Sequence, residues 1–162
     1  MMSKNKKIYI LQIGMTRNIG GIESYLIQQF RHIDKSKIMF DFVNITSEYD
    51  IVFKDEIIKE NSKVYEICSR HKNPLLHYWQ WIALLLKNRN KYKAIVLNSV
   101  DLSYVFPLFI AKLVGIPIRI IHSHNADYGY KIGILRKILI RFNKILLDFS
   151  ATTYFACSQK AG

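Results

Sequence analysis

The stretch IGMTRNIGGIESYL, residues 13–26, decides the fold of this 162-residue chain. It continues the apolar run KIYILQI, residues 7–13, which has the nearly unbroken hydrophobicity of a strand buried on both faces. The paired glycines Gly20 and Gly21 come next, and residues 22–33 then repeat apolar side chains at helical spacing. A buried strand, a glycine loop and a helix in this order are typical of the first unit of a parallel α/β sheet.

The same alternation continues along the rest of the chain. Strands are expected at residues 7–13, 39–45, 63–67, 94–99, 118–124 and 152–158, and helices at 22–33, 55–62, 74–90, 102–114 and 132–149. Strands that alternate with helices imply right-handed crossovers. The sequence therefore predicts an α/β fold, a Rossmann-like, doubly wound parallel sheet of about six strands with helices on both faces. The sixth strand stands where a further helix should follow, so we expect one domain of a longer protein.

Composition narrows the function classes. Half of the residues are hydrophobic, which argues against disorder, and Cys68 and Cys157 fit no metal or redox spacing, so a cytoplasmic setting is expected. The net charge of +12 suits nucleic acid, an anionic membrane surface or phosphate-bearing substrates. No zinc-finger spacing, helix-turn-helix pattern or aromatic-basic RNA-binding pattern accompanies it, so we expect no nucleic-acid partner. The longest apolar block, residues 81–86, is too short to cross a bilayer.

The glycine loop predicts an anion site. A helix N-terminus favours anions, and Gly20 and Gly21 would let a phosphate approach the backbone closely. The dinucleotide pattern is missing, because Gly14 stands six residues before Gly20, and Asn44 ends the second strand where an acid would bind a ribose. The P-loop pattern is missing too. The alternative is a tight turn with a helix cap, and in either case the helix dipole favours Glu23 in the first turn.

A second candidate is the polar run HSHN that ends the fifth strand. His122 and His124 alternate on the strand, so both rings should lie on one side, at the carboxyl end where ligands bind. They could act as general bases, as hydrogen-bond donors, or, with Asp127, as metal ligands. A purely structural pair is the third interpretation. Asn98 and Ser99 end the fourth strand, so strand ends one, four and five should converge on one cleft.

The helix expected at 132–149 carries an apolar stripe and a basic flank. The stripe consists of Leu135, Ile138, Phe142, Ile145 and Phe149, and the flank consists of Lys137, Arg141 and Lys144. We expect the stripe to face the core, and the alternative is a helix that rests on anionic lipid head groups. Trp79 and Trp81, in the apolar helix expected at 74–90, are expected in the core.

Three short motifs carry a family resemblance. GGIE after the first strand, HSHN after the fifth and ACSQKAG at the end resemble, in this order, the N-terminal domain of family 4 glycosyltransferases. These are retaining, GT-B-fold enzymes of bacterial capsule and exopolysaccharide synthesis. The resemblance implies that residues 1–162 form one Rossmann-like, acceptor-side domain. It also implies that the C-terminal domain, which binds the donor and carries an acidic pair, is absent here, so this chain alone should be inactive.

The resemblance also implies roles for individual residues. Gly20 and Gly21 resemble the loop near the donor diphosphate, and His124 resembles the histidine at the transferred sugar and thus the catalytic position. The implied acceptor-binding residues are His122, Asn125, Asn98 and Ser99. The expected partners are a nucleotide sugar, a glycan or polyprenyl-diphosphate-linked acceptor, the missing domain and an anionic membrane face. No cofactor or metal is expected. The alternatives are a metal-dependent hydrolase built on His122, His124 and Asp127, and a non-catalytic flavodoxin-like binding module.

Overall fold

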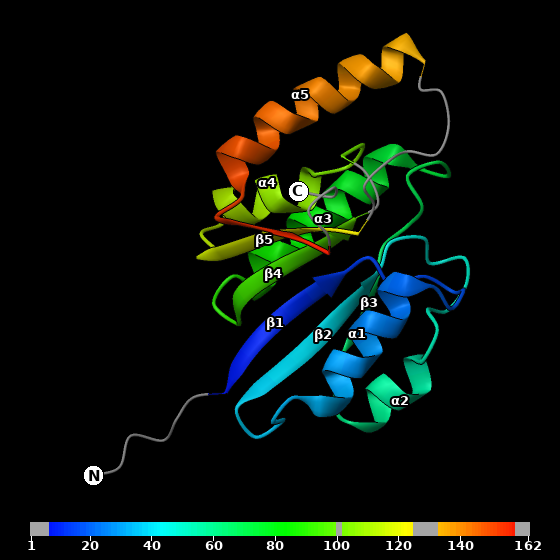
Figure 1. Cartoon of the computed structure of the whole chain (residues 1–162), viewed down its shortest axis with the longest axis vertical. Coiled ribbons are helices and arrows are strands. Elements are labelled where there is room, and N and C mark those ends of the chain that lie inside the picture. Colours follow the sequence, from blue (N-terminus) through cyan, green and yellow to red (C-terminus); the bar gives the residue numbers. More distant parts are fainter. Residues whose placement is uncertain (1–6, 100–101, 125–132, 158–162) are drawn as a thin grey trace.

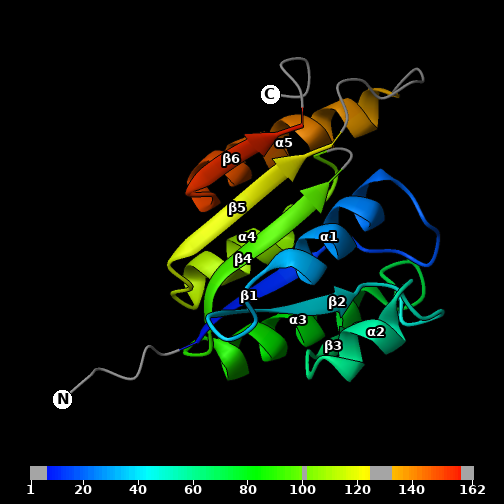
Figure 2. The same cartoon turned by 60° about the horizontal axis from the view of Figure 1, so that its bottom comes forward.

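A computed structural model describes residues 7–99, 102–124 and 133–157 of the chain. The described residues form a parallel sheet with strand order β3-β2-β1-β4-β5-β6 (Figure 2). The strands are β1 (Ile8–Ile13), β2 (Ile38–Asn44), β3 (Val64–Glu66), β4 (Tyr92–Ser99), β5 (Ile118–Ser123) and β6 (Thr153–Ala156). All five neighbouring pairs are parallel, which confirms the predicted sheet.

Five helices connect the described strands. They are α1 (Gly21–His32), α2 (Lys54–Lys59), α3 (Pro74–Asn88), α4 (Phe106–Leu113) and α5 (Ile134–Ser150). Helices α1 and α2 cover one face of the sheet, and α3, α4 and α5 cover the other (Figure 1). The doubly wound, Rossmann-like fold class is therefore confirmed. Among the described residues, no helix is both long and apolar enough to span a membrane.

Each face of the sheet buries its own hydrophobic core. On the α1 side, Phe30 meets Phe42 edge-on at 5.7 Å between ring centroids. On the α3 side, Trp81 and Leu85 are fully buried against the sheet. Successive strand residues point to opposite faces, so Phe42 belongs to the first core and Val43 to the second. The even burial of both faces explains why the strands are nearly continuous apolar runs.

The start of α4 differs from the prediction. The apolar pattern predicted a helix from Leu102, whereas α4 begins at Phe106 with Pro107 in its first turn. Proline is well tolerated there because it lacks only a backbone N–H that would have no helical partner. The Leu102 carbonyl instead accepts a hydrogen bond of 2.8 Å from Asn143 Nδ2 on α5. The segment before α4 thus serves as a contact for another helix.

The two tryptophans of α3 lie in different environments. Trp81 is fully buried, but Trp79 is 65% exposed, so the prediction that both lie in the core was wrong for Trp79. Residues two apart on a helix are separated by about 200° around its axis and cannot share a face. The same spacing argument therefore puts only one of them in the core.

The orientation of α5 also overturns an expectation. Its buried residues are Asn143, Leu147 and Ser150, whereas the apolar stripe predicted to face the core is exposed. The inward face packs Leu147 into the core on the α3 side, and Asn143 Nδ2 donates to the Leu102 carbonyl. Ser150 Oγ donates to the Leu146 carbonyl of its own helix. The contacts of Leu147 and Asn143 fix the rotation of the helix, so the stripe points away from the sheet.

Candidate functional site

A cleft of about 970 Å³ opens at the carboxyl edge of the sheet. It lies where β1 and β4 are neighbours, and the chain leaves these two strands toward opposite faces of the sheet. In open α/β sheets ligands bind at this switch point. The cleft is lined by Ile13, Gly14, Thr16, Gly20, Gly21, Ile22, Glu23, Tyr25, Ile45, Leu97, Asn98, Ser99, Ser103, Tyr104, His122, His124 and Cys157. The prediction that strand ends one, four and five converge on one cleft is confirmed.

Gly14 brings the ends of β1 and β4 together. Its φ of +123° is a conformation that L side chains rarely adopt, and a Cβ here would lie 2.4 Å from the Asn98 carbonyl oxygen. Only glycine fits both restrictions. The sequence showed Gly14 as an isolated glycine directly after a strand, but it did not show that a neighbouring strand passes so close.

The N-terminus of α1 forms one wall of the cleft. Gly20 is the N-cap residue and provides no side-chain cap, and Gly21 has open space around the position of a Cβ. The first N–H groups of a helix have no partner within the helix, so they can bind a ligand or water. Both glycines therefore lie where the anion-site prediction requires, and phosphate binding by them stays a prediction.

Glu23 ties the glycine loop to this helix. Its side chain is buried, and Oε1 accepts hydrogen bonds from Thr16 N at 3.0 Å and Thr16 Oγ1 at 2.7 Å. A glutamate at the third helical position commonly reaches back in this way toward the preceding loop. Apart from the two histidines, Glu23 is the only acidic or basic residue among the described residues that line the cleft. A phosphate there would have to rely on backbone N–H groups.

The two histidines lie side by side, as predicted. The ring centroids of His122 and His124 are 4.1 Å apart, and Tyr25 of α1 meets both rings edge-on, at 4.9 and 5.4 Å. The Tyr25 hydroxyl accepts a hydrogen bond of 2.7 Å from Gln29 Nε2. Tyr25 is thus a residue of the site that sequence reasoning missed, because only the packing of α1 against β5 reveals it.

A buried amide pair orients His124. Asn98 Nδ2 donates to Gln12 Oε1 at 3.1 Å and to the Ile13 carbonyl at 3.0 Å, which leaves Asn98 Oδ1 as the acceptor for His124 Nε2 at 3.2 Å. This network assigns the hydrogen of the neutral imidazole to Nε2 and leaves Nδ1 with a lone pair. The sequence predicted Asn98 next to the histidines but gave no signal for the role of Gln12.

The backbone around His124 is also fixed. The Ser99 carbonyl accepts from His124 N at 3.0 Å, and Cys157 Sγ approaches the His124 carbonyl at 3.2 Å. Burial lowers the pKa of His124 to about 4, helped by the neighbouring charge of His122 and opposed by Glu23. Burial likewise lowers the pKa of His122. Both rings are therefore neutral at pH 7 and can accept a proton.

Two predicted site residues, Asn125 and Asp127, lie outside the described residues. The acceptor role of Asn125 stays a prediction. Among residues 7–99, 102–124 and 133–157, no group of three or more His, Cys, Asp or Glu side chains could hold a metal ion. The metal-dependent hydrolase requires Asp127, so it too stays a hypothesis.

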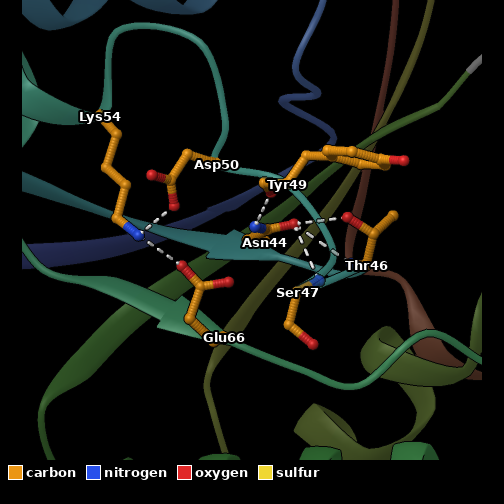
Figure 3. Close-up of polar contacts among 7 residues, drawn as sticks. All are labelled: Asn44, Thr46, Ser47, Tyr49, Asp50, Lys54 and Glu66. Carbon is orange, nitrogen blue, oxygen red and sulfur yellow. Dashed lines mark hydrogen bonds and ion pairs between the residues drawn. The ribbon is translucent and has the colours of Figure 1, made fainter.

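Asn44, at the position where dinucleotide-binding proteins have an acid, shapes a loop instead (Figure 3). Its Oδ1 accepts from Thr46 N at 3.2 Å and from Ser47 N at 3.4 Å, and its Nδ2 donates to the Tyr49 carbonyl at 2.6 Å. Because these bonds occupy both ends of the buried amide, Asn44 organises the loop after β2. This agrees with the exclusion of a dinucleotide site.

Comparison with known proteins gives one informative similarity. The chain is 28% identical over 164 aligned positions to a Bacillus subtilis (strain 168) protein named "Putative glycosyltransferase EpsF". The alignment covers all of this chain and 41% of that protein, so the chain spans less than half the length of this curated relative. No protein-family model matches the chain. No solved structure matches it significantly. The similarity supports a glycosyltransferase role in general terms.

Proposed function

We propose that this chain is the acceptor-side domain of a glycosyltransferase that uses a nucleotide sugar. The observation that carries the proposal is the neutral His122–His124 pair, which lies in the cleft opposite the uncapped N-terminus of α1. The histidine pair provides a proton acceptor, and the N-terminus of α1 provides a set of backbone N–H groups. A glycosyl transfer needs both features, since a proton leaves the acceptor hydroxyl and negative charge develops on the leaving phosphate.

The chemistry of the lining favours a sugar over a free anion. Tyr25, Asn98 and the histidines offer neutral hydrogen-bonding groups and an aromatic edge, whereas Glu23 adds negative charge. Such a wall suits hydroxyl groups, and most of the binding energy for a diphosphate would have to come from a second domain. This agrees with a chain that spans 41% of a longer relative.

The finer features belong to the same proposal. The enzyme would be a retaining hexosyltransferase of family 4 with the GT-B fold, acting in capsule or exopolysaccharide synthesis without a metal. Its acceptor would be a glycan or a polyprenyl-diphosphate-linked sugar, with His124 at the reacting centre and Asn125 and Ser99 near the acceptor. A cytoplasmic location is part of the proposal, and the free thiols Cys68 and Cys157 support it.

Transfer assays on the intact protein test the proposal. A panel of nucleotide sugars is offered with a lipid-linked or oligosaccharide acceptor, and glycosylated product is measured by mass spectrometry. We expect product with the wild type and at least a hundredfold less, as an order-of-magnitude expectation, with His124→Ala. His71→Ala is the matched control, because His71 is exposed and lies outside the cleft. No product from any donor, full activity of His124→Ala, or stoichiometric zinc or manganese in the purified protein would each contradict it.

A further inference from the structure

Helix α5 exposes an apolar face that the other described elements leave largely uncovered; only Phe149, at its C-terminal end, contacts Phe109 and Lys112 of α4. Seven apolar side chains are between 42% and 80% exposed: Ile134, Leu135, Ile138, Leu139, Phe142, Ile145 and Phe149. A helix that covers a sheet normally turns such a stripe inward. Helix α5 lies at the outer side of the molecule (Figure 1), and the exposed side chains of its stripe are available to a partner.

A row of cations borders this stripe. Lys137, Arg141 and Lys144 are exposed, and none of their side chains forms an ion pair or hydrogen bond with a residue of the described ranges. The only acidic residue of α5 is Asp148, which accepts a hydrogen bond of 3.1 Å from the Tyr154 hydroxyl. The outward surface of α5 is therefore apolar along one edge and positively charged along the next.

The fold holds this surface in place. At the C-terminal end of α5, Arg119 Nε donates to the Ser150 carbonyl at 2.6 Å, and Lys112 Nζ donates to the Phe149 carbonyl at 2.5 Å. The buried Asn143 binds the Leu102 carbonyl from the opposite side of the helix. These contacts are made by the inward face and by the helix end, so docking on the outward face requires no rearrangement.

We propose that α5 docks this protein onto the surface of an anionic lipid bilayer. The helix, about 25 Å long, lies in the plane of the interface, with its apolar stripe at the level of the acyl chains and its basic row on the lipid phosphates. Charge complementarity selects this partner. Anionic lipids attract unpaired Lys and Arg side chains, whereas a second copy of a chain with net charge +12 would be repelled.

This proposal stands apart from the glycosyl-transfer proposal, because lipid binding can be measured without substrate. The intact protein is sedimented with vesicles of phosphatidylcholine alone, or of phosphatidylcholine containing about one-third phosphatidylglycerol. We expect binding to the anionic vesicles only. Raised salt should weaken that binding, because screening reduces the contribution of the basic row.

Two sets of variants separate the roles of the stripe and the row. Ile138→Ser with Phe142→Ser should weaken vesicle binding by at least about tenfold. Glu in place of Lys137, Arg141 and Lys144 should weaken it by at least about a hundredfold. Ile58→Ser with Tyr49→Ser is the apolar control, and Glu in place of Lys59, Lys63 and Lys93 is the charge control. All of these control positions are exposed and none is on α5, so both controls should bind like the wild type.

Circular dichroism and size-exclusion light scattering complete the test. Folded, monomeric variants that have lost vesicle binding support the proposal. It is overturned if the wild type does not bind anionic vesicles, or if the α5 variants bind as well as their controls. It is also overturned if the wild type is a dimer that Ile138→Ser and Phe142→Ser dissociate without any effect on lipid binding.

Discussion

Gly14 directly follows β1 and Gly21 begins α1, so the two glycines flank one loop. The space around them differs. A Cβ at Gly14 would collide with the Asn98 carbonyl at 2.4 Å, in a backbone conformation with φ +123°, whereas a Cβ at Gly21 meets nothing within 4 Å. We therefore expect Gly14→Ala to lower the free energy of unfolding by about 3 kcal/mol. Urea denaturation measures this loss.

Gly21→Ala provides the matched control for that substitution. It should change the free energy of unfolding by less than about 1 kcal/mol, because α1 accepts alanine at this position without a clash. Equal stability of the two variants would mean that β1 and β4 do not approach each other at Gly14 as described. With stability preserved, weaker binding of a nucleotide sugar by Gly21→Ala would report directly on the wall of the cleft.

Asn98 is the residue that links His124 to the sheet. In Asn98→Asp, a carboxylate would accept the hydrogen of His124 Nε2 and stabilise the imidazolium, so the pKa of His124 should rise from about 4. An NMR titration of the imidazole resonances measures this shift. Asn143→Asp, a buried amide on α5 far from the histidines in the sequence, should leave the pKa of His124 unchanged. If Asn98→Asp has no effect either, the Asn98–His124 hydrogen bond is not present in solution.

At the level of elements, the C-terminal end of α5 depends on Arg119. Its guanidinium reaches from β5 to the carbonyls of Ser150, Ile116 and Pro117, so it joins the helix end to the loop before the strand. A cation at a helix C-terminus also interacts favourably with the helix dipole. We expect Arg119→Ala to lower the free energy of unfolding by about 2 kcal/mol and to speed hydrogen exchange in α5.

The control for this prediction is a residue of α5 itself. The Arg141 side chain is exposed and has no hydrogen-bonding partner among the described residues, so Arg141→Ala should leave stability and exchange rates close to those of the wild type. Protection of α5 that is equal in the two variants would show that the helix end does not need Arg119.

The elements also show which parts of the structure could be predicted from sequence. Hydrophobic runs located β1, β4 and β5 closely, and the ends of these strands gave the correct edge for the cleft, because strand periodicity and parallel topology are local properties. The orientation of α5 could not be predicted in the same way. Periodicity reveals a stripe, but the polar anchors Asn143, Arg119 and Lys112, which come from three elements, decide which way the stripe points.

The candidate site shows the same limit. His122 and His124 stood out as polar residues at the end of an apolar strand, so the sequence could identify them. Gln12 and Tyr25 act through contacts with residues that are distant in the sequence, namely Asn98 and the histidines. Their roles follow from the packing of β1 and α1 against β4 and β5, and no local pattern encodes that packing.

For the whole molecule, the buried His77 and His122 and the half-buried His124 give stability a defined dependence on pH. Burial lowers the pKa of His77, His122 and His124 below the ordinary value of 6.5, in the case of His124 to about 4. Between these two values the unfolded chain binds protons that the native protein does not. Stability is therefore complete above about pH 6.5 and falls as the pH is lowered toward 4, with a slope of at most about 1.4 kcal/mol per pH unit for each proton.

Urea denaturation at pH 7, 6 and 5 measures this slope, and His124→Gln removes one contributor and should flatten it. The exposed carboxyl of Asp34 does not complicate the measurement. Hydrogen bonds from Ser36 and Lys37 lower its pKa to about 2, so its contribution disappears only at more acidic pH. A free energy of unfolding that stays constant from pH 7 to pH 5 would mean that the pKa values of the three histidines are not lowered in the folded protein. Their side chains would then be more accessible to water than the structure shows.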